Sequence, residues 1–115
     1  MTRVFVFTNH KGGVGKSTSA TNIALGMVQL LRRAYATNPR VLIIDTDSQG
    51  HASLVTTGRK DYRADDSLYT VLMADRINAP QTLLNCIVPS QWDADLHILP
   101  ASPMLESAER ELMGV

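Results

Sequence analysis

Hydrophobic residues near the amino terminus form a pattern that predicts a strand, a loop, a helix and a second strand. Residues 4–8 (Val-Phe-Val-Phe-Thr) show little polar alternation, which is typical of a strand buried on both faces of a parallel sheet. Residues 41–45 (Val-Leu-Ile-Ile-Asp) are a second apolar run, which ends in a carboxylate. Between the two runs, apolar positions recur at helical spacing and predict one inward stripe: Ala20, Ile23, Ala24, Met27, Leu30, Leu31 and Tyr35. This order implies a right-handed βαβ crossover and an α/β fold.

The second half of the chain gives weaker signals. Residues 46–66 are polar and predict loops, and the charged segment 59–66 is interpreted as a solvated face. Ser67 is the predicted cap of a short helix that runs through Leu68, Val71 and Leu72. Strands are predicted at 85–88 and 96–99. Ser102-Pro103 is predicted to open a last helix, whose inward residues are Leu105, Ala108 and Leu112.

Composition limits the class of protein. The chain has 115 residues, 44% of them hydrophobic, and its 11 basic residues balance 11 acidic ones. These values indicate one globular domain and argue against a strongly basic nucleic-acid module. The single cysteine, Cys86, excludes an internal disulfide and is interpreted as a small buried apolar residue. No apolar run approaches the roughly 18 residues of a membrane span, and the start lacks a signal peptide, so a soluble cytoplasmic protein is expected.

Residues 9–18 (Asn-His-Lys-Gly-Gly-Val-Gly-Lys-Ser-Thr) have the composition of a phosphate-binding loop between a strand and a helix. Glycines allow backbone N–H groups to converge on an anion, and the helix adds its positive dipole end. Lys16 would reach the β- and γ-phosphates, the Ser17 hydroxyl would coordinate Mg²⁺, and Thr18 would donate near the α-phosphate. The alternative is an ordinary tight turn between strand and helix.

The loop departs from the usual pattern G-x-x-x-x-G-K-[ST], because His10 stands where the first glycine belongs. A second lysine, Lys11, opens the loop instead. We expect Lys11 to point outward, toward a phosphate held by a neighbouring subunit.

The segment K-G-G-V-G-K-S-T resembles the deviant Walker A motif of the ParA/MinD group of P-loop ATPases, and Asn9-His10 resembles the ParA (Soj-like) partition branch. The resemblance implies ATP and Mg²⁺ as cofactors. It gives Lys11 the role of the signature lysine that crosses an ATP-sandwich dimer, and Lys16 that of the P-loop lysine. The implied cofactor-binding residues are Lys11, Gly12, Gly13, Val14, Gly15, Lys16, Ser17 and Thr18.

A second match covers residues 41–50, which resemble the family's hydrophobic strand followed by D-x-D-P-Q-G-N. By this resemblance Asp47 positions or activates the attacking water, and Asp45 lies near the Mg²⁺ shell that Ser17 also joins. Ser48 replaces the usual proline and His51 the usual asparagine. The alternative for the two aspartates is a surface turn with an aspartate as helix cap. Residues 99–102 (Leu-Pro-Ala-Ser) resemble the family's L-P-A segment.

The family's Walker B strand, an apolar run ending in D-x-P-P, is not found after Leu99. The family's strand order would place it between residues 4–8 and 41–45. Residues 1–115 therefore resemble the N-terminal part of a ParA-type ATPase domain, with an incomplete P-loop NTPase-like parallel sheet flanked by helices. The two strands could pair directly, a second copy could fill the gap, or the chain could belong to a longer protein.

The resemblance implies a Mg-ATP-binding and hydrolysing switch protein in plasmid or chromosome partitioning, with Asp47, Lys11 and Lys16 as catalytic residues. Its partners would be a second copy of the chain and a centromere-binding ParB-type protein, without a membrane. Non-specific DNA is a partner of the full-length family, whose DNA-contacting surface is not found here. Two alternatives stay open: a truncated nucleotide-binding or interaction module without turnover, and a regulator of the MinD or autokinase kind.

Overall fold

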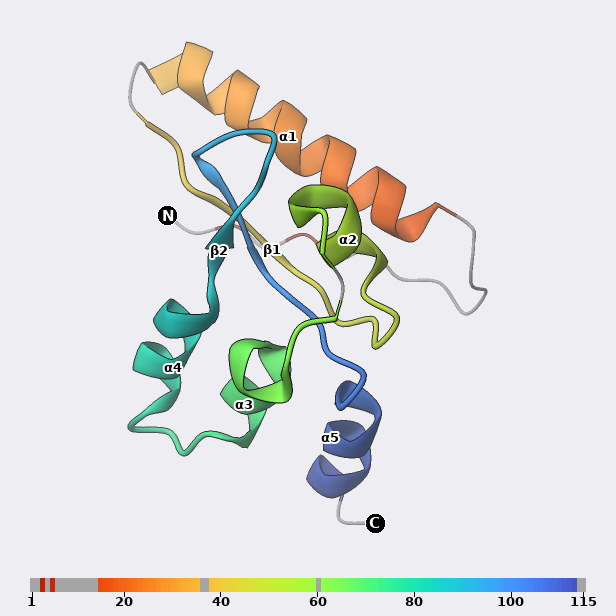
Figure 1. Cartoon of the computed structure of the whole chain (residues 1–115). Helices are drawn as coiled ribbons and strands as arrows, with labels where there is room; N and C mark the ends of the chain where they lie inside the picture. The colour runs from red at the N-terminus through yellow and green to blue at the C-terminus, as the bar shows by residue number, and fades with distance from the viewer. Residues whose placement is uncertain (1–2, 4, 6–14, 36–37, 60, 114–115) are drawn as a thin grey trace.

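The structure, a computed structural model, describes residues 3, 5, 15–35, 38–59 and 61–113. Within these ranges the elements follow in the order α1 (Lys16–Tyr35), β1 (Val41–Ile44), α2 (His51–Thr57), the 3₁₀-helix η1 (Ala64–Asp66), α3 (Leu68–Met73), α4 (Ala79–Cys86), β2 (Val88–Pro89), β3 (Leu96–Leu99) and α5 (Leu105–Leu112) (Figure 1). Among the described helices, none combines the length and the apolar character that crossing a membrane requires.

The three strands form one sheet in the order β1-β3-β2. β1 and β3 are parallel, with Val41 opposite Leu96 and Ile44 opposite Leu99, whereas β2 is antiparallel to β3. The predicted α/β fold with flanking helices is confirmed, but the observed parallel pair joins β1 to β3, whereas the predicted pairing with residues 4–8 lies outside the described residues. The antiparallel edge strand β2 makes the sheet mixed. Within the described ranges β1 has a strand neighbour on one edge only.

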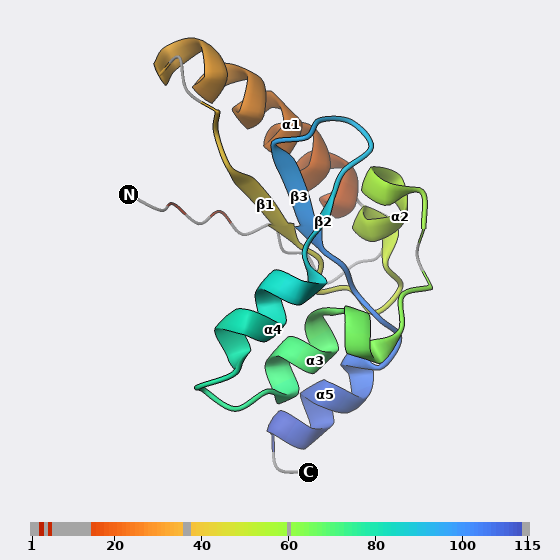
Figure 2. The same ribbon diagram turned by 60° about the vertical axis from the view of Figure 1, so that its left-hand side comes forward.

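Two apolar clusters hold the helices against the sheet. On one face, α1 and α2 pack over β1 and β3, and the buried cluster comprises Ala24, Val28, Ile43, Ala52, Leu96 and Ile98. Beyond the carboxyl end of β3, helices α3, α4 and α5 gather around a second cluster of Leu68, Cys86, Leu99, Ala101 and Leu105 (Figure 2). Successive strand residues point to opposite faces, so Ile98 joins the first cluster and Leu99 the second.

Helix α1 forms where it is predicted, but its buried side differs from the predicted stripe. Of the predicted positions only Ala24 is buried, while Ile23, Leu30 and Tyr35 are exposed. The buried line is Thr21, Ala24 and Val28. The buried Thr21 hydroxyl has a hydrogen-bond partner, because it donates to the Ser17 carbonyl oxygen at 2.8 Å. A polar residue can therefore lie where α1 contacts the sheet. The apolar pattern alone therefore misplaces the packed face.

The predicted loop at 46–66 is partly wrong, because it contains α2 and η1. The charged segment within it is nevertheless solvated, with Asp61, Arg63 and Asp66 exposed. The Ser67 cap is confirmed, since its hydroxyl oxygen accepts from the Tyr69 amide at 3.3 Å. Helix α4 is not predicted by the sequence pattern; it runs to Cys86, so the strand predicted at 85–88 begins only at Val88.

Helix α5 begins at Leu105, two residues after the predicted first position at Pro103. Its Leu105 and Ala108 are buried as predicted, but Leu112 is 60% exposed, so that part of the prediction is wrong. The strand predicted at 4–8 lies outside the described residues except for Phe5. Phe5 itself is in no strand and is 59% exposed, contrary to the burial predicted for this position.

Candidate functional site

The amino end of α1 contains the second half of the predicted phosphate-binding loop. Gly15 has a φ of 86°, a backbone conformation that side chains disfavour, and directly precedes the helix. The first helical bond runs from the Ser19 amide to the Gly15 carbonyl oxygen at 2.8 Å. Amides of the turn before Ser19 therefore point outward along the helix axis, the arrangement that favours an anion.

The structure places Gly15, Lys16, Ser17 and Thr18 at this helix start, while Lys11, Gly12, Gly13 and Val14 lie outside the described residues. The turn is braced from the core side. Buried Thr21 donates to the Ser17 carbonyl oxygen at 2.8 Å and approaches that of Thr18 at 3.2 Å. This one hydroxyl, shared between two carbonyl oxygens, holds the turn that carries the predicted ligands.

Asp45 follows β1 directly and is buried, with 4% of its surface exposed. Its Oδ2 accepts from the Ser53 amide at 2.9 Å and from the Ser53 hydroxyl at 2.7 Å. Its Oδ1 accepts from the Asp47 amide at 3.2 Å. The first amides of a helix have no acceptor within the helix, and a nearby carboxylate can satisfy them. Asp45 does this for the Ser53 amide in the first turn of α2, which agrees with the alternative that an aspartate caps a helix here.

Asp47 lies two residues further on and is half-buried. Its Oδ1 accepts from the Gln49 amide at 3.0 Å, and its carbonyl oxygen accepts from the Gly50 amide at 2.8 Å. The imidazole Nδ1 of His51 lies 3.9 Å from the second carboxylate oxygen. The loop at 45–50 is thus a closed turn that presents the Asp47 carboxylate partly to solvent.

The amino end of α1 and the carboxyl end of β1 lie toward the same end of the sheet in both views (Figures 1 and 2). The described part of the first motif, residues 15–18, and the loop after β1 therefore lie toward the carboxyl end of β1, the usual position of ligand sites in α/β folds. The side chains of Ser17 and Asp47 carry oxygen atoms of the kind that suits Mg²⁺. Asp45, the other predicted metal residue, is buried, and both of its carboxylate oxygens already accept hydrogen bonds from the protein.

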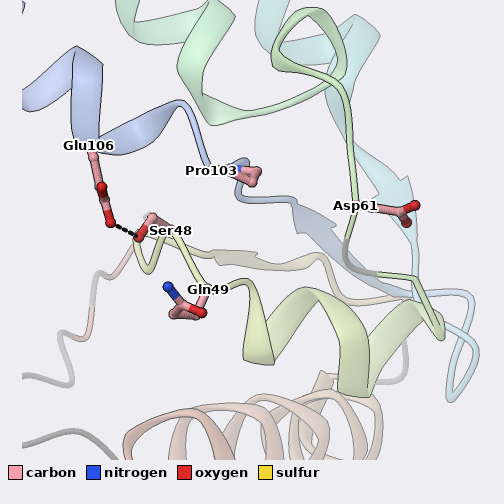
Figure 3. Close-up of a pocket in the computed structure, with 5 residues that line it drawn as sticks. All are labelled: Ser48, Gln49, Asp61, Pro103 and Glu106. Carbon is pink, nitrogen blue, oxygen red and sulfur yellow. Dashed lines mark hydrogen bonds between the residues drawn. The ribbon is translucent and has the colours of Figure 1, made fainter.

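Other candidate chemistry is limited in the described part of the chain. No group of three or more His, Cys, Asp or Glu residues there is arranged to hold a metal ion. A pocket of about 230 Å³ adjoins the 45–50 loop and is lined by Ser48, Gln49, Asp61, Pro103 and Glu106. In it the Ser48 hydroxyl donates to Glu106 Oε1 at 3.2 Å (Figure 3).

Sequence reasoning missed Ser53, which the structure places inside the site. The reason is that α2 was not predicted, so residue 53 had no assigned face. The sequence does contain a signal for α2, because the seven residues between Gly50 and Gly58 include no helix breaker. In the structure both glycines adopt left-handed conformations at the ends of this helix.

Three comparisons relate this geometry to known proteins. The model of a family described as "AAA domain" matches residues 2–115. The chromosome partitioning protein ParA of Myxococcus xanthus is 35% identical over 112 residues, covering 97% of this chain and 35% of that protein. The chromosome-partitioning ATPase Soj of Thermus thermophilus is 33% identical, covering 97% and 37%. The chain therefore spans about a third of the length of these relatives.

Among solved structures, cobyrinic acid a,c-diamide synthase from Mycobacterium smegmatis, with a bound ATP analogue and magnesium, matches with a TM-score of 0.70 and 28% identity. The match covers 92% of this chain and 37% of that one. A structure of the same enzyme with ADP and magnesium matches equally. The described elements thus have the arrangement of one part of a larger nucleotide-binding protein.

Proposed function

Because the chain belongs to the AAA-domain family, as a P-loop ATPase of the ParA/MinD kind, we propose that it binds Mg-ATP and hydrolyses it as a partition switch. The observation that carries the proposal is the juxtaposition of two motifs. The start of α1 and the loop after β1 lie toward the same end of the sheet (Figure 2). Residues 1–115 are then the N-terminal part of a ParA-type ATPase domain.

The phosphate side of the proposed site is the amino end of α1. Lys16, with the backbone amides of the first turn, binds the β- and γ-phosphates, and the Ser17 hydroxyl holds Mg²⁺. When bound, the ion supplies charge neutralisation across the phosphates. Support comes from the left-handed Gly15 before the helix and from the brace by Thr21.

The water side of the proposed site is the 45–50 loop. Asp47 orients a water for in-line attack on the γ-phosphate, because its carboxylate is half-buried and tied to its own turn by the Gln49 amide. Lys11 contributes from a second copy of the chain in a nucleotide-joined dimer, and Lys11 and Lys16 neutralise the charge that develops.

The biological role we propose is segregation of plasmids or chromosomes, together with a centromere-binding ParB-type partner. Its support is the naming of both ParA and Soj relatives as partitioning proteins. Binding of non-specific DNA is proposed for a full-length protein of this kind.

The direct test combines ATP binding, measured by calorimetry with and without Mg²⁺, with phosphate release. We expect Mg-dependent binding that Lys16→Ala weakens at least about a hundredfold, from the loss of a phosphate-facing charge. Asp47→Asn should reduce phosphate release about a hundredfold while changing ATP affinity little. Lys60→Ala and Asp65→Asn remove the same charges outside both motifs and serve as controls.

Each outcome decides between the alternatives. Phosphate release that neither Lys16→Ala nor Asp47→Asn reduces would contradict the proposed enzyme. Binding that depends on Lys16 but occurs without phosphate release would leave a nucleotide-binding module without turnover, the second hypothesis from the sequence.

A further inference from the structure

Ser53 is fully buried on the first half of α2, at the point where three segments of the chain meet. We propose that Ser53 is a positioning residue for Asp47: its hydroxyl links the end of β3 to the carboxylate that holds the Asp47 amide. The consequence for turnover rests on the proposed ATPase function, whereas the link itself is a property of the protein without nucleotide.

The link is a continuous path of hydrogen bonds. The Ala101 amide donates to Ser53 Oγ at 3.0 Å, and the Ser53 hydroxyl donates to Asp45 Oδ2 at 2.7 Å. On the other carboxylate oxygen, Asp45 accepts from the Asp47 amide at 3.2 Å. The path therefore runs from the segment after β3, through α2, to the residue proposed to orient water.

A hydroxyl is the group that this position requires. Ser53 Oγ accepts from one segment and donates to another, and a serine hydroxyl performs both roles at once. Ala101 and Ser53 are fully buried, and Asp45 is nearly so. Removal of the hydroxyl would leave the Ala101 amide and one Asp45 lone pair without this partner in a buried place, where water replaces it poorly.

The same path explains what Asp45 does in this chain. Three donors from the protein occupy its two carboxylate oxygens, and one of them is the Asp47 amide. Asp45 thus sets the direction in which the chain leaves β1, and with it the place of the Asp47 side chain. Asp45 is thus a second positioning residue, which acts through Asp47.

A second contact holds the same loop from outside. Ser48, which stands where the family pattern has proline, donates to Glu106 of α5 at 3.2 Å across the pocket (Figure 3). Glu106 and Ala101 belong to one short stretch after β3, which contacts the loop directly through Glu106 and indirectly through Ser53 of α2. The outer bond is exposed and contributes little by itself, so the buried bond through Ser53 is the one to test.

The first measurement uses the chain without nucleotide. Amide hydrogen exchange, followed by NMR, should become at least about tenfold faster at Asp47 and Ala101 in Ser53→Ala than in the wild type. The matched control is Ser67→Ala, a fully buried serine that caps α3 and lies outside this path. Ser67→Ala should leave the exchange rates of the Asp47 and Ala101 amides unchanged relative to those of neighbouring amides in β1 and β3.

The second measurement separates positioning from binding. In Ser53→Ala, kcat should fall roughly ten- to a hundredfold while the KM for ATP and the Mg²⁺ concentration at half-saturation stay within about twofold. Ser53→Thr keeps the hydroxyl and should restore most of kcat. Equal kinetics and equal exchange in Ser53→Ala and Ser67→Ala would overturn the proposal, as would a large change in the Mg²⁺ requirement of Ser53→Ala alone.

If Ser53→Ala does not fold, amide exchange in the wild type still tests the proposal. Its Ala101 and Asp47 amides should exchange as slowly as the paired amides of β3, and exchange at the rate of an unfolded chain would refute the link. Failure of the proposed function has a different signature, because the wild type would then release no phosphate while the exchange results stayed as expected.

Discussion

Asp45 and Asp47 are two residues apart in one loop, yet the fold gives their carboxylates different surroundings. Asp45 is buried and accepts hydrogen bonds on both oxygens, whereas Asp47 is half-buried and bonds mainly within its own turn. A buried, fully bonded carboxylate is suited to hold structure, and a partly solvated one is suited to meet a water molecule. The spacing D-x-D does not distinguish these roles, but the neighbours do.

Cys86 shows the same dependence on surroundings, and its reactivity can be predicted. Burial raises the pKa of the Cys86 thiol, and the nearby negative charges of Asp66 and Asp65 raise it further. The thiolate is therefore scarcer at a given pH than in an exposed thiol. We expect iodoacetamide at pH 8 to label the native chain at least about tenfold more slowly than the chain unfolded in urea, as followed by mass spectrometry.

The labelling result is unambiguous because the chain has one cysteine. Labelling of the native chain should keep accelerating with pH above the range in which the labelling rate of a free thiol has reached its plateau, because the pKa of Cys86 is raised. Equal rates for the native and unfolded chains would show that Cys86 is accessible and would contradict its place in the second cluster.

At the scale of elements, one arginine fastens the carboxyl-terminal part of α1 to the turn between β2 and β3. Arg32 Nη2 lies 2.9 Å from Asp93 Oδ1 and 2.7 Å from Asp95 Oδ2. The Arg32 side chain is 44% exposed, so this contact orients the helix more than it stabilises the fold. The hydrogen bonds to Asp93 and Asp95 raise the pKa of Arg32 above its usual value.

This ion pair has a testable pH signature. The hydrogen bond from Arg32 holds the pKa of Asp93 below its ordinary value. A lowered folded-state pKa means that its contribution to stability is present above the unfolded-state pKa of about 4 and is lost as the pH falls through the lower, folded-state value. In Arg32→Gln, the pKa of Asp93 should rise toward its ordinary value, as measured by NMR titration of the carboxyl carbon.

Arg33→Gln is the matched control for this titration. One residue further along a helix is rotated by about 100°, so Arg33 faces away from the turn that Arg32 contacts. If Arg33→Gln changed the Asp93 titration as much as Arg32→Gln, a general charge effect would explain the shift and the specific contact would not.

The ends of the helices supply a second prediction at this scale. Gly58 ends α2 with a φ of 77°, and a Cβ there would lie 3.0 Å from the Gln91 side chain. The side chain can move, but the left-handed backbone is strained for alanine, so Gly58→Ala should lower the free energy of unfolding by about 1 kcal/mol.

Gly26 is the matched glycine, because it lies in the interior of α1 and a Cβ there would meet nothing within 4 Å. Gly26→Ala should raise the free energy of unfolding by about 0.5–1 kcal/mol, since alanine favours the helix and restricts the unfolded chain. Urea unfolding measures both variants. The same sign for the two substitutions would contradict the assigned helix boundaries.

At the scale of the whole molecule, one apolar cluster lies on the face of the sheet that α1 and α2 cover and the other lies beyond the carboxyl end of β3. Leu96 of β3 is fully buried in the first cluster. Leu96→Ala should lower the free energy of unfolding by about 2–5 kcal/mol, because it removes buried methyl groups and leaves a cavity under α1 and α2. Leu84→Ala makes the same chemical change at a position that is 65% exposed on α4, and it should cost about 0.5 kcal/mol or less.

Equal losses for the two leucines in urea unfolding would contradict the placement of α1 over β3. The other face of β1 is more open, since Leu42 and Ile44 are 39% and 54% exposed. Within the described residues, most burial lies on the face that α1 and α2 cover and at the carboxyl end of β3.

Much of the candidate site could be predicted from sequence because its signals are local. Glycines before a helix, a lysine and hydroxyls at its start, and carboxylates after an apolar strand each act through neighbouring backbone. The helix at 16–35 and the strands at 41–44 and 96–99 were predictable for the same reason. The buried face of α1 was not, because Thr21 is polar and its burial depends on a bond to the Ser17 carbonyl oxygen.

The sequence by itself thus determined the α/β class, the helix start that suits phosphate and the two carboxylates beyond the strand, since each follows from composition and spacing within a few residues. Only the tertiary structure decided that β1 pairs with β3, that α2 covers the sheet, and that Ser53 joins Asp45 to Ala101. Those contacts link residues up to 55 positions apart, as in the pair Val41 and Leu96. Long-range contacts of this kind depend on packing and on buried hydrogen bonds that no local pattern records.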